Sequence, residues 1–201
     1  MSIELIRAQP THEHGLAFAG YLETAAEGAF RLMLGSGFAE VLATAYLQPE
    51  HDLSYESVTF ATDAGSIVGM LNAFSSEQHA RSSTKPLVDA AGWRSLRMAA
   101  LVAAGYPKFR FLDRIPDGDY YVQALAVSES ERGKGIGSRL LAHAEELAVS
   151  SGQARLSLHV DVRNSGAERL YGRHGLSIEA TSGKAWLIGG EQVHRMAKPL
   201  T

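Results

Sequence analysis

Three glycines at alternating positions follow a β-rich run and open an amphipathic stretch in the second half of the chain. They are Gly133, Gly135 and Gly137, in the segment VSESERGKGIGS at residues 127–138. Without side chains, backbone N–H groups at the start of a helix are open to an anion, and the helix dipole favours negative charge there. Arg132 and Lys134 add formal positive charge at the same point. The segment therefore predicts a phosphate-binding turn.

Three phosphate motifs compete for this turn. A Walker A loop needs G-x-x-x-x-G-K-[ST], which the segment lacks, and the Rossmann fingerprint G-x-G-x-x-G finds its third glycine one residue early. Asp161 stands roughly where a Rossmann fold places its ribose acid, but too few residues follow it for a doubly wound sheet. The third pattern, [QR]-x-x-G-x-[GA], fits residues 132–137 at every fixed position.

Strand and helix patterns around the turn show what must position it. Residues 120–127 read as a strand, 135–150 as a helix and 154–160 as the next strand. Ser165 and Glu168 predict a capping box for a short helix that ends at Gly175. Two closing strands are expected at residues 176–180 and 193–197.

The first 118 residues follow a different pattern. We expect a strand near residues 3–8 and a helix cap at Thr11, and we interpret the stretch from Leu16 to Leu47 as two helices broken near residues 35–37. Residues 57–61 and 67–74 predict a hairpin. Residues 76–118 predict a helical insertion, with one helix from Pro86 to Ala104 that Gly105-Tyr106-Pro107 ends. The element order predicts a mixed α/β domain.

At this point the chain resembles the GCN5-related N-acetyltransferase (GNAT) superfamily, in which the third pattern binds the pyrophosphate of acetyl-CoA. The strand end Leu125-Ala126-Val127 precedes the turn at the expected distance. A second block, residues 162–176, is similar to the superfamily's N-x-x-A-x-x-L-Y-x-x-x-G-F pattern, with Leu176 where phenylalanine is usual. The likeness covers residues 120–200, and residues 76–118 match no known motif.

The resemblance implies a fold and a domain plan. We expect a GNAT-like central sheet, mixed but mostly antiparallel, splayed between the fourth and fifth strands and flanked by helices. Residues 1–201 would form one domain. Its parts would be N-terminal strands and helices (1–75), the helical insertion before the fourth strand (76–118), and the acetyl-CoA-binding and catalytic half (119–201).

The resemblance also assigns roles to residues. The backbone of Leu125 and Val127 would pair with the pantetheine arm, and the Leu125 amide would polarise the acetyl carbonyl. Tyr171 would be the catalytic acid that protonates the departing sulfur, and Asn164 would bind the cofactor. The implied cofactor-binding set is Leu125, Ala126, Val127, Arg132, Gly133, Lys134, Gly135, Ile136, Gly137, Ser138, Asn164 and Tyr171.

The general base stays unassigned. Some members of the superfamily carry a glutamate where this chain has Tyr121. Asp119, Gln123 and an ordered water are the alternatives, and the amine could also arrive already neutral. His159 lies close to the expected splay and could face the cleft.

Composition excludes several classes of protein. The chain has no cysteine, which excludes a disulfide framework, cysteine-ligated metals and a cysteine nucleophile. A net charge of −3 argues against a nucleic-acid partner. The N-terminus lacks signal-peptide features, and the longest apolar run, residues 98–104, is too short for a membrane span. We therefore expect a cytoplasmic protein with no membrane partner and no metal.

The resulting prediction is an N-acetyltransferase that moves the acetyl group of acetyl-CoA directly to a primary amine. The acceptor would be a small-molecule amine or a protein N-terminus or lysine. A CoA-binding sensor without turnover and a nucleotide-dependent oxidoreductase are the alternatives. Trp93 and residues 98–104 are predicted to lie in the core or in a subunit contact, and a homodimer is a hypothesis.

Overall fold

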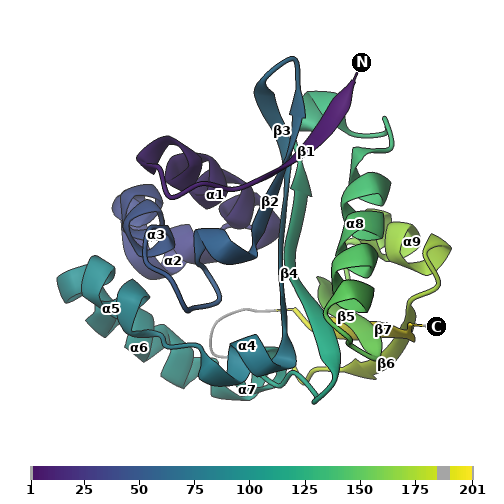
Figure 1. The fold of residues 1–201 in the computed structure, drawn as a ribbon. Helices are drawn as coiled ribbons and strands as arrows, with labels where there is room; N and C mark the ends of the chain where they lie inside the picture. Colours follow the sequence, from purple (N-terminus) through teal and green to yellow (C-terminus); the bar gives the residue numbers. More distant parts are fainter. Residues whose placement is uncertain (1, 185–190, 201) are drawn as a thin grey trace.

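The computed structural model describes residues 2–184 and 191–200, whose strands form one sheet in the order β1-β2-β3-β4-β5-β7-β6 (Figure 1). The strands are β1 (Ile3–Arg7), β2 (Val58–Asp63), β3 (Ser66–Ser75), β4 (Asp119–Val127), β5 (Arg155–Asp161), β6 (Ser177–Thr181) and β7 (Val193–Pro199). Neighbouring strands are antiparallel except for the parallel pair β4–β5. The expectation of a mixed, mostly antiparallel sheet is confirmed.

Helices cover both faces of this sheet, with α1 to α3 against one face and α8 and α9 against the other (Figure 1). The helices are α1 (His12–Ala25), α2 (Ala29–Leu34), α3 (Phe38–Tyr46), α4 (Ser76–Arg81), α5 (Lys85–Ala91), α6 (Ser95–Ala104), α7 (Tyr106–Leu112), α8 (Ile136–Ser150) and α9 (Ser165–Arg173). Each face buries its own apolar cluster. Phe18, Tyr46 and Phe60 lie in the first cluster, and Leu140, Leu156 and Leu158 lie in the second.

A β-bulge in β4 opens the sheet. Ala124 lies opposite Asn72 and Val122 lies opposite Ala73, so Gln123 is one extra residue on β4. The parallel pairing of β4 with β5 covers residues 119–122 and stops immediately before this bulge. Because a bulge disrupts pairing and bends its strand, the two strands separate from Gln123 onward. The expected splay between the fourth and fifth strands is confirmed.

A buried ion cluster holds the other end of the same two strands together. Asp119 is fully buried, and its carboxylate accepts a hydrogen bond from Arg195 Nη2 at 2.7 Å. Arg155 Nε lies 3.2 Å from the second oxygen, and Glu179 accepts from Arg155 Nη2 at 2.6 Å. These contacts join β4, β5, β6 and β7. A buried carboxylate persists only with such partners.

The N-terminal helices differ from the expectation in number. Residues 12–46 form three α-helices rather than the two expected between Leu16 and Leu47, because α1 ends at Ala25 and the chain turns through Glu27 and Gly28. The carboxylate of Glu23 accepts from the backbone N–H groups of Phe30 and Arg31. Glu23 thereby caps the start of α2, a contact that local spacing does not indicate.

The insertion is helical, as expected, but more broken. Gly92 takes a φ of 54° and ends α5, so the single helix predicted from Pro86 to Ala104 is wrong. The predicted end at Ala104 is confirmed, because α6 ends there with Gly105 as its C-cap. A new helix, α7, starts at once, with Pro107 in its first turn, where a proline is tolerated. Trp93 is 75% exposed, so the core alternative for this side chain is wrong, and the subunit contact stays a prediction.

The predicted capping box of α9 is wrong as well. Asn164, not Ser165, is the N-cap residue, and its Oδ1 accepts from the N–H of Ala167 at 3.1 Å. Asparagine and serine are equally good N-caps, so two adjacent candidates left the start of the helix uncertain by one residue.

Candidate functional site

A large cleft lies along the open part of β4. Its volume is about 1690 Å³, and it reaches from the Gly-rich turn and α9 to α2, α6 and α7. A pocket for a drug-sized ligand is roughly 300–1,000 Å³, so this cleft has room for a long ligand and a second molecule.

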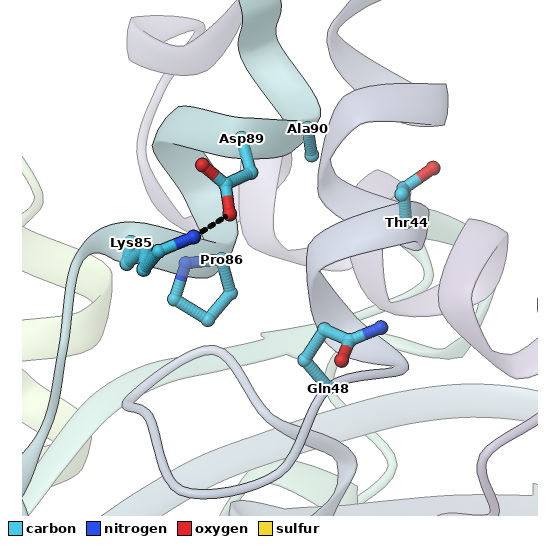
Figure 2. A pocket seen from close by; sticks show the side chains of 6 residues that line it. All are labelled: Thr44, Gln48, Lys85, Pro86, Asp89 and Ala90. Atoms are coloured by element: carbon cyan, nitrogen blue, oxygen red, sulfur yellow. Dashed lines mark hydrogen bonds and ion pairs between the residues drawn. The ribbon is translucent and has the colours of Figure 1, made fainter.

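A second, smaller hollow of about 510 Å³ lies between α3 and α5. Figure 2 shows its six lining side chains, with Lys85 in an ion pair with Asp89. The two carry the formal charges among these residues, and they neutralise each other. We therefore place the chemistry in the large cleft.

The edge of β4 presents free backbone groups to this cleft. Ser128 N–H donates to Val68 O at 2.9 Å, so Ser128 and Val68 form a hydrogen-bonded pair of the β3–β4 ladder. Such pairs alternate along antiparallel strands, so Leu125 and Val127 direct their N–H and C=O groups away from β3. Arg132 Nε donates to Val127 O at 3.3 Å from that open side. The edge is ready to accept an extended ligand as an additional strand.

The three glycines of the turn have two different roles. Gly133 and Gly135 take φ values of 79° and 84°, and a Cβ added to either would meet no atom within 4 Å. Both therefore keep a left-handed backbone beside open space at the start of α8. A Cβ on Gly137 would lie 3.2 Å from Leu170 Cδ2, so this glycine lets α8 and α9 approach closely.

The other cofactor-binding candidates of the turn divide between the cleft and the outer surface. Ala126, Arg132, Ile136 and Ser138 line the cleft. The ammonium of Lys134 forms an ion pair with Glu131 at 3.0 Å, and Lys134 is not among the described residues that line the cleft. Two arginines that the sequence reading did not select, Arg169 and Arg173 of α9, also line it.

Tyr171 reaches the cleft from α9. Its ring is buried, and its hydroxyl has no hydrogen-bond partner among the described residues. Burial raises the pKa of Tyr171 to about 12, so the hydroxyl stays protonated and can donate at neutral pH. Asn164 lines the cleft too, but its Oδ1 already caps α9, which leaves the amide NH₂ for a ligand.

Two aromatic side chains and a histidine come together on the side of the bulge where β4 is still paired with β5. Tyr121 Oη lies 2.9 Å from His159 Nδ1, and the ring of Phe111 lies 5.2 Å from the His159 ring. Burial, with the positive charge of Arg195, lowers the pKa of His159 to about 4. Burial raises the pKa of Tyr121 well above its ordinary value. Both groups are therefore neutral at pH 7.

An acid–histidine pair that sequence reasoning missed lies at the same end. His79 Nδ1 lies 2.8 Å from Asp52 Oδ2, and His79 Nε2 lies 3.1 Å from the carbonyl oxygen of Asp113. Both ring nitrogens thus face acceptors, which favours the imidazolium form. The hydrogen bond to Asp52 is the largest of the influences that raise the pKa of His79. No spacing in the sequence indicates this pair, because its members come from separate segments.

The proposed alternatives for the general base are placed differently. Asp119 is fully buried between two arginines and does not face the cleft. Gln123 lines the cleft, and its Oε1 accepts from Asn72 Nδ2 at 2.8 Å.

Among the described residues there is no group of three or more histidine and acidic side chains that could hold a metal ion. Within the same part of the chain, no helix is both long enough and apolar enough to cross a membrane.

Comparison with known sequences identifies the family. The sequence model of the acetyltransferase (GNAT) family matches residues 29–176, which include the splay, the Gly-rich turn and Tyr171. The chain belongs to the GNAT family. The match covers most of the chain and extends through the whole insertion.

Relatives of known description agree with this membership. The chain is 43% identical over 70 residues to GCN5-related N-acetyltransferase 4, chloroplastic, of Arabidopsis thaliana. That alignment covers 34% of this chain and 24% of the plant protein, so the chain spans about a quarter of that GNAT relative.

Solved structures show the same fold. One described as an acetyltransferase has a TM-score of 0.70 at 23% identity and covers 98% of this chain and 100% of its own. An N-acetyltransferase from Staphylococcus aureus Mu50 has a TM-score of 0.67 at 17% identity, covering 97% and 100%. A NatC complex bound to Gag peptide and CoA has a TM-score of 0.59 at 16% identity, covering 100% of both chains.

Proposed function

We propose that this GNAT protein is an N-acetyltransferase that moves the acetyl group of acetyl-CoA directly to a primary amine. The observation that carries the proposal is the open edge of β4, where Leu125 and Val127 direct their backbone groups away from β3 and lead to the start of α8. The edge fits an extended amide chain, and the turn fits its diphosphate. The oxidoreductase alternative required a doubly wound parallel sheet, which the mostly antiparallel sheet excludes.

Each part of the proposed reaction has a group in the cleft. The N–H of Leu125 donates to the thioester carbonyl oxygen, an interaction often worth about 2.7–4 kcal/mol when the donor is preorganised. The amine nitrogen forms a bond to the carbonyl carbon as the C–S bond breaks. A neutral amine loses one proton and the sulfur gains one, so the reaction balances without a further reactant. An acceptor that arrives as an ammonium first releases one additional proton to water.

Tyr171 supplies the hydrogen bond to the departing sulfur. With a pKa of about 12, its hydroxyl is a weaker acid than a thiol of pKa about 8.5. Complete proton transfer to the thiolate is then uphill by roughly 5 kcal/mol. Tyr171 acts first by stabilising the thiolate through a hydrogen bond.

Two measurements test the function. Calorimetry with acetyl-CoA should show binding, and a saturating ligand should raise the melting temperature, since a hundredfold excess over Kd adds about 2.7 kcal/mol. Thiol release with a panel of amines should follow. Binding without thiol release would favour the CoA-sensor alternative, and no binding would contradict both.

Three further predictions from the sequence do not depend on this proposal. A location in the cytoplasm, the single-domain plan of residues 1–201 and a homodimer stay predictions.

A further inference from the structure

The cleft has an apolar wall that is built largely by the insertion. Its side chains are Phe30 and Met33 of α2, Leu101 and Val102 of α6, and Phe109 and Leu112 of α7. Several of them also pack against the first core cluster, so the wall is anchored rather than loose. Such a surface binds an apolar body and disfavours polar groups that cannot find partners there.

One carboxylate, that of Asp52, lines the same cleft from a fixed position. Asn72 Nδ2 donates to Asp52 O at 3.0 Å and to Gln123 Oε1 at 2.8 Å, which holds Asp52 beside the bulge. Gln123 is two residues from Leu125, whose N–H is proposed to polarise the thioester. Asp52 therefore lines the cleft beside the bulge, close in the fold to the proposed reacting centre.

Only part of this carboxylate is used by the protein itself. Asp52 Oδ2 accepts from His79, while Oδ1 has no hydrogen-bond partner among the described residues and is not fully buried. The side chain is 20% exposed, so water only partly screens the attraction between Oδ1 and a cation placed beside it.

Several of the remaining charged side chains of this end of the cleft are exposed or already paired, and Arg110 of α7 is an exposed cation in the lining. The side chain of Asp113 is 81% exposed, and Glu27 lies 3.4 Å from Arg163. Lys108 donates to the carbonyl oxygen of Glu191. A polyamine would leave its further ammonium groups against the apolar wall, and a peptide would leave backbone groups unpaired there.

We propose that this end of the cleft selects, as acceptor, a primary amine carried on an apolar chain or ring. The ammonium is collected at Asp52 Oδ1 and the apolar body lies against the wall of α2, α6 and α7. The inference rests on the proposed acetyl transfer and names the substrate class of that same site.

The test compares thiol release from acetyl-CoA with four amines. 2-Phenylethylamine is an ammonium with an apolar body, ethylamine lacks the body, spermidine has several charges, and aniline is neutral at pH 7. We expect kcat/KM for 2-phenylethylamine to exceed that for ethylamine and spermidine at least tenfold.

Asp52 variants separate charge recognition from a structural role. Asp52→Asn should raise KM for 2-phenylethylamine about tenfold, which corresponds to about 1.4 kcal/mol, while KM for aniline and for acetyl-CoA changes less than threefold. Asp52→Glu, which keeps the charge, should restore part of the loss. Asp89→Asn removes an exposed carboxylate outside the cleft and should change nothing.

The outcomes are distinct. Equal rates with ethylamine or spermidine would overturn the proposed class, and an equal loss with aniline would show that Asp52 only supports the structure. Absence of acetyl-CoA binding and of thiol release with every amine would instead overturn the proposed function, and the inference with it. If circular dichroism shows that Asp52→Asn does not fold, the proposed acceptor class is still tested by the amine preference of the unaltered protein and by Asp52→Glu.

Discussion

The two ends of the cleft are built from different parts of the chain. The end that we assign to the cofactor uses mainly backbone groups, from the edge of β4 and the turn before α8, which are neighbours in sequence. The acceptor end uses side chains from α2, α6, α7 and the segment around Asp52. Backbone recognition depends on glycines and strand edges, whereas side-chain recognition can change one residue at a time. The first end is therefore the one that a sequence motif can describe.

The largest expected loss of acetyl-CoA affinity comes from placing a side chain on the Gly-rich turn. Gly135→Val should weaken acetyl-CoA binding a hundredfold or more, because the side chain would fill the open space at the start of α8 and strain a φ of 84°. Calorimetry measures the affinity.

Gly152→Val is the matched control for that strain. Gly152 lies just after the other end of α8, has a φ of 73° and is equally open. The Gly152→Val variant should lose a comparable free energy of unfolding and bind acetyl-CoA with unchanged affinity. Equal loss of affinity in both variants would show that strain, not a blocked phosphate site, explains Gly135.

The next test concerns a side chain at the cofactor end. Tyr171→Phe should lower the single-turnover rate about 10²-fold and leave acetyl-CoA affinity within a few-fold, since the hydroxyl would act on the departing sulfur. Single-turnover kinetics avoid masking by product release.

Tyr120→Phe is its control, because Tyr120 is another buried tyrosine and does not line the cleft. Its rate should match that of the unaltered protein. An unchanged rate in Tyr171→Phe would exclude Tyr171 as the acid.

The pH dependence of stability tests the charge of His79 at the acceptor end of the cleft. The pKa of His79 is raised in the folded protein, so its contribution to stability is complete below the ordinary value of about 6.5 and is lost as pH rises through the raised value. Melting curves should show His79→Gln less stable than the unaltered protein at pH 5.5, with the difference shrinking toward pH 9.

The exposed His12 serves as the comparison for that series. His12→Gln should track the unaltered protein more closely at every pH, because surface ion pairs contribute little. A difference for His79→Gln that does not vary with pH would contradict the imidazolium assignment.

The smallest expected effect tests the packing role of Gly137. Helical Gly→Ala substitutions stabilise by up to about 1 kcal/mol, and Gly20→Ala on α1 should approach that gain because its Cβ meets no atom. Gly137→Ala should gain less, since its Cβ would press on Leu170. Chemical denaturation of both variants measures the difference, and equal gains would remove the packing role.

Local patterns account for the parts of the fold that could be predicted. The hairpin of β2 and β3 and the start of α8 follow from turn residues next to the strands that they join. The α9 cap was misplaced because Asn164 and Ser165 are interchangeable candidates. The break between α1 and α2 was missed because its cap comes from Glu23, one helix earlier.

The acceptor end could not be predicted for a physical reason. Asp52 and His79 meet only after α4 folds back on the sheet, and Tyr121 meets His159 across the parallel pair of strands. Neither contact leaves a spacing in the sequence. The positions of Leu125 and Val127 were predicted from the family likeness, but the direction of their backbone groups depends on the ladder register.

The opening of the cleft depends on the number of residues in β4, through the bulge at Gln123, and not on the type of residue at that position. Any substitution at this position keeps the number of residues on β4 and with it the separation from β5. A deletion would remove the extra residue, restore a regular ladder with β3 and take away the cause of the separation from β5. When sequences of this family are aligned, a gap at this position therefore signals the loss of the cleft more reliably than any change of residue type.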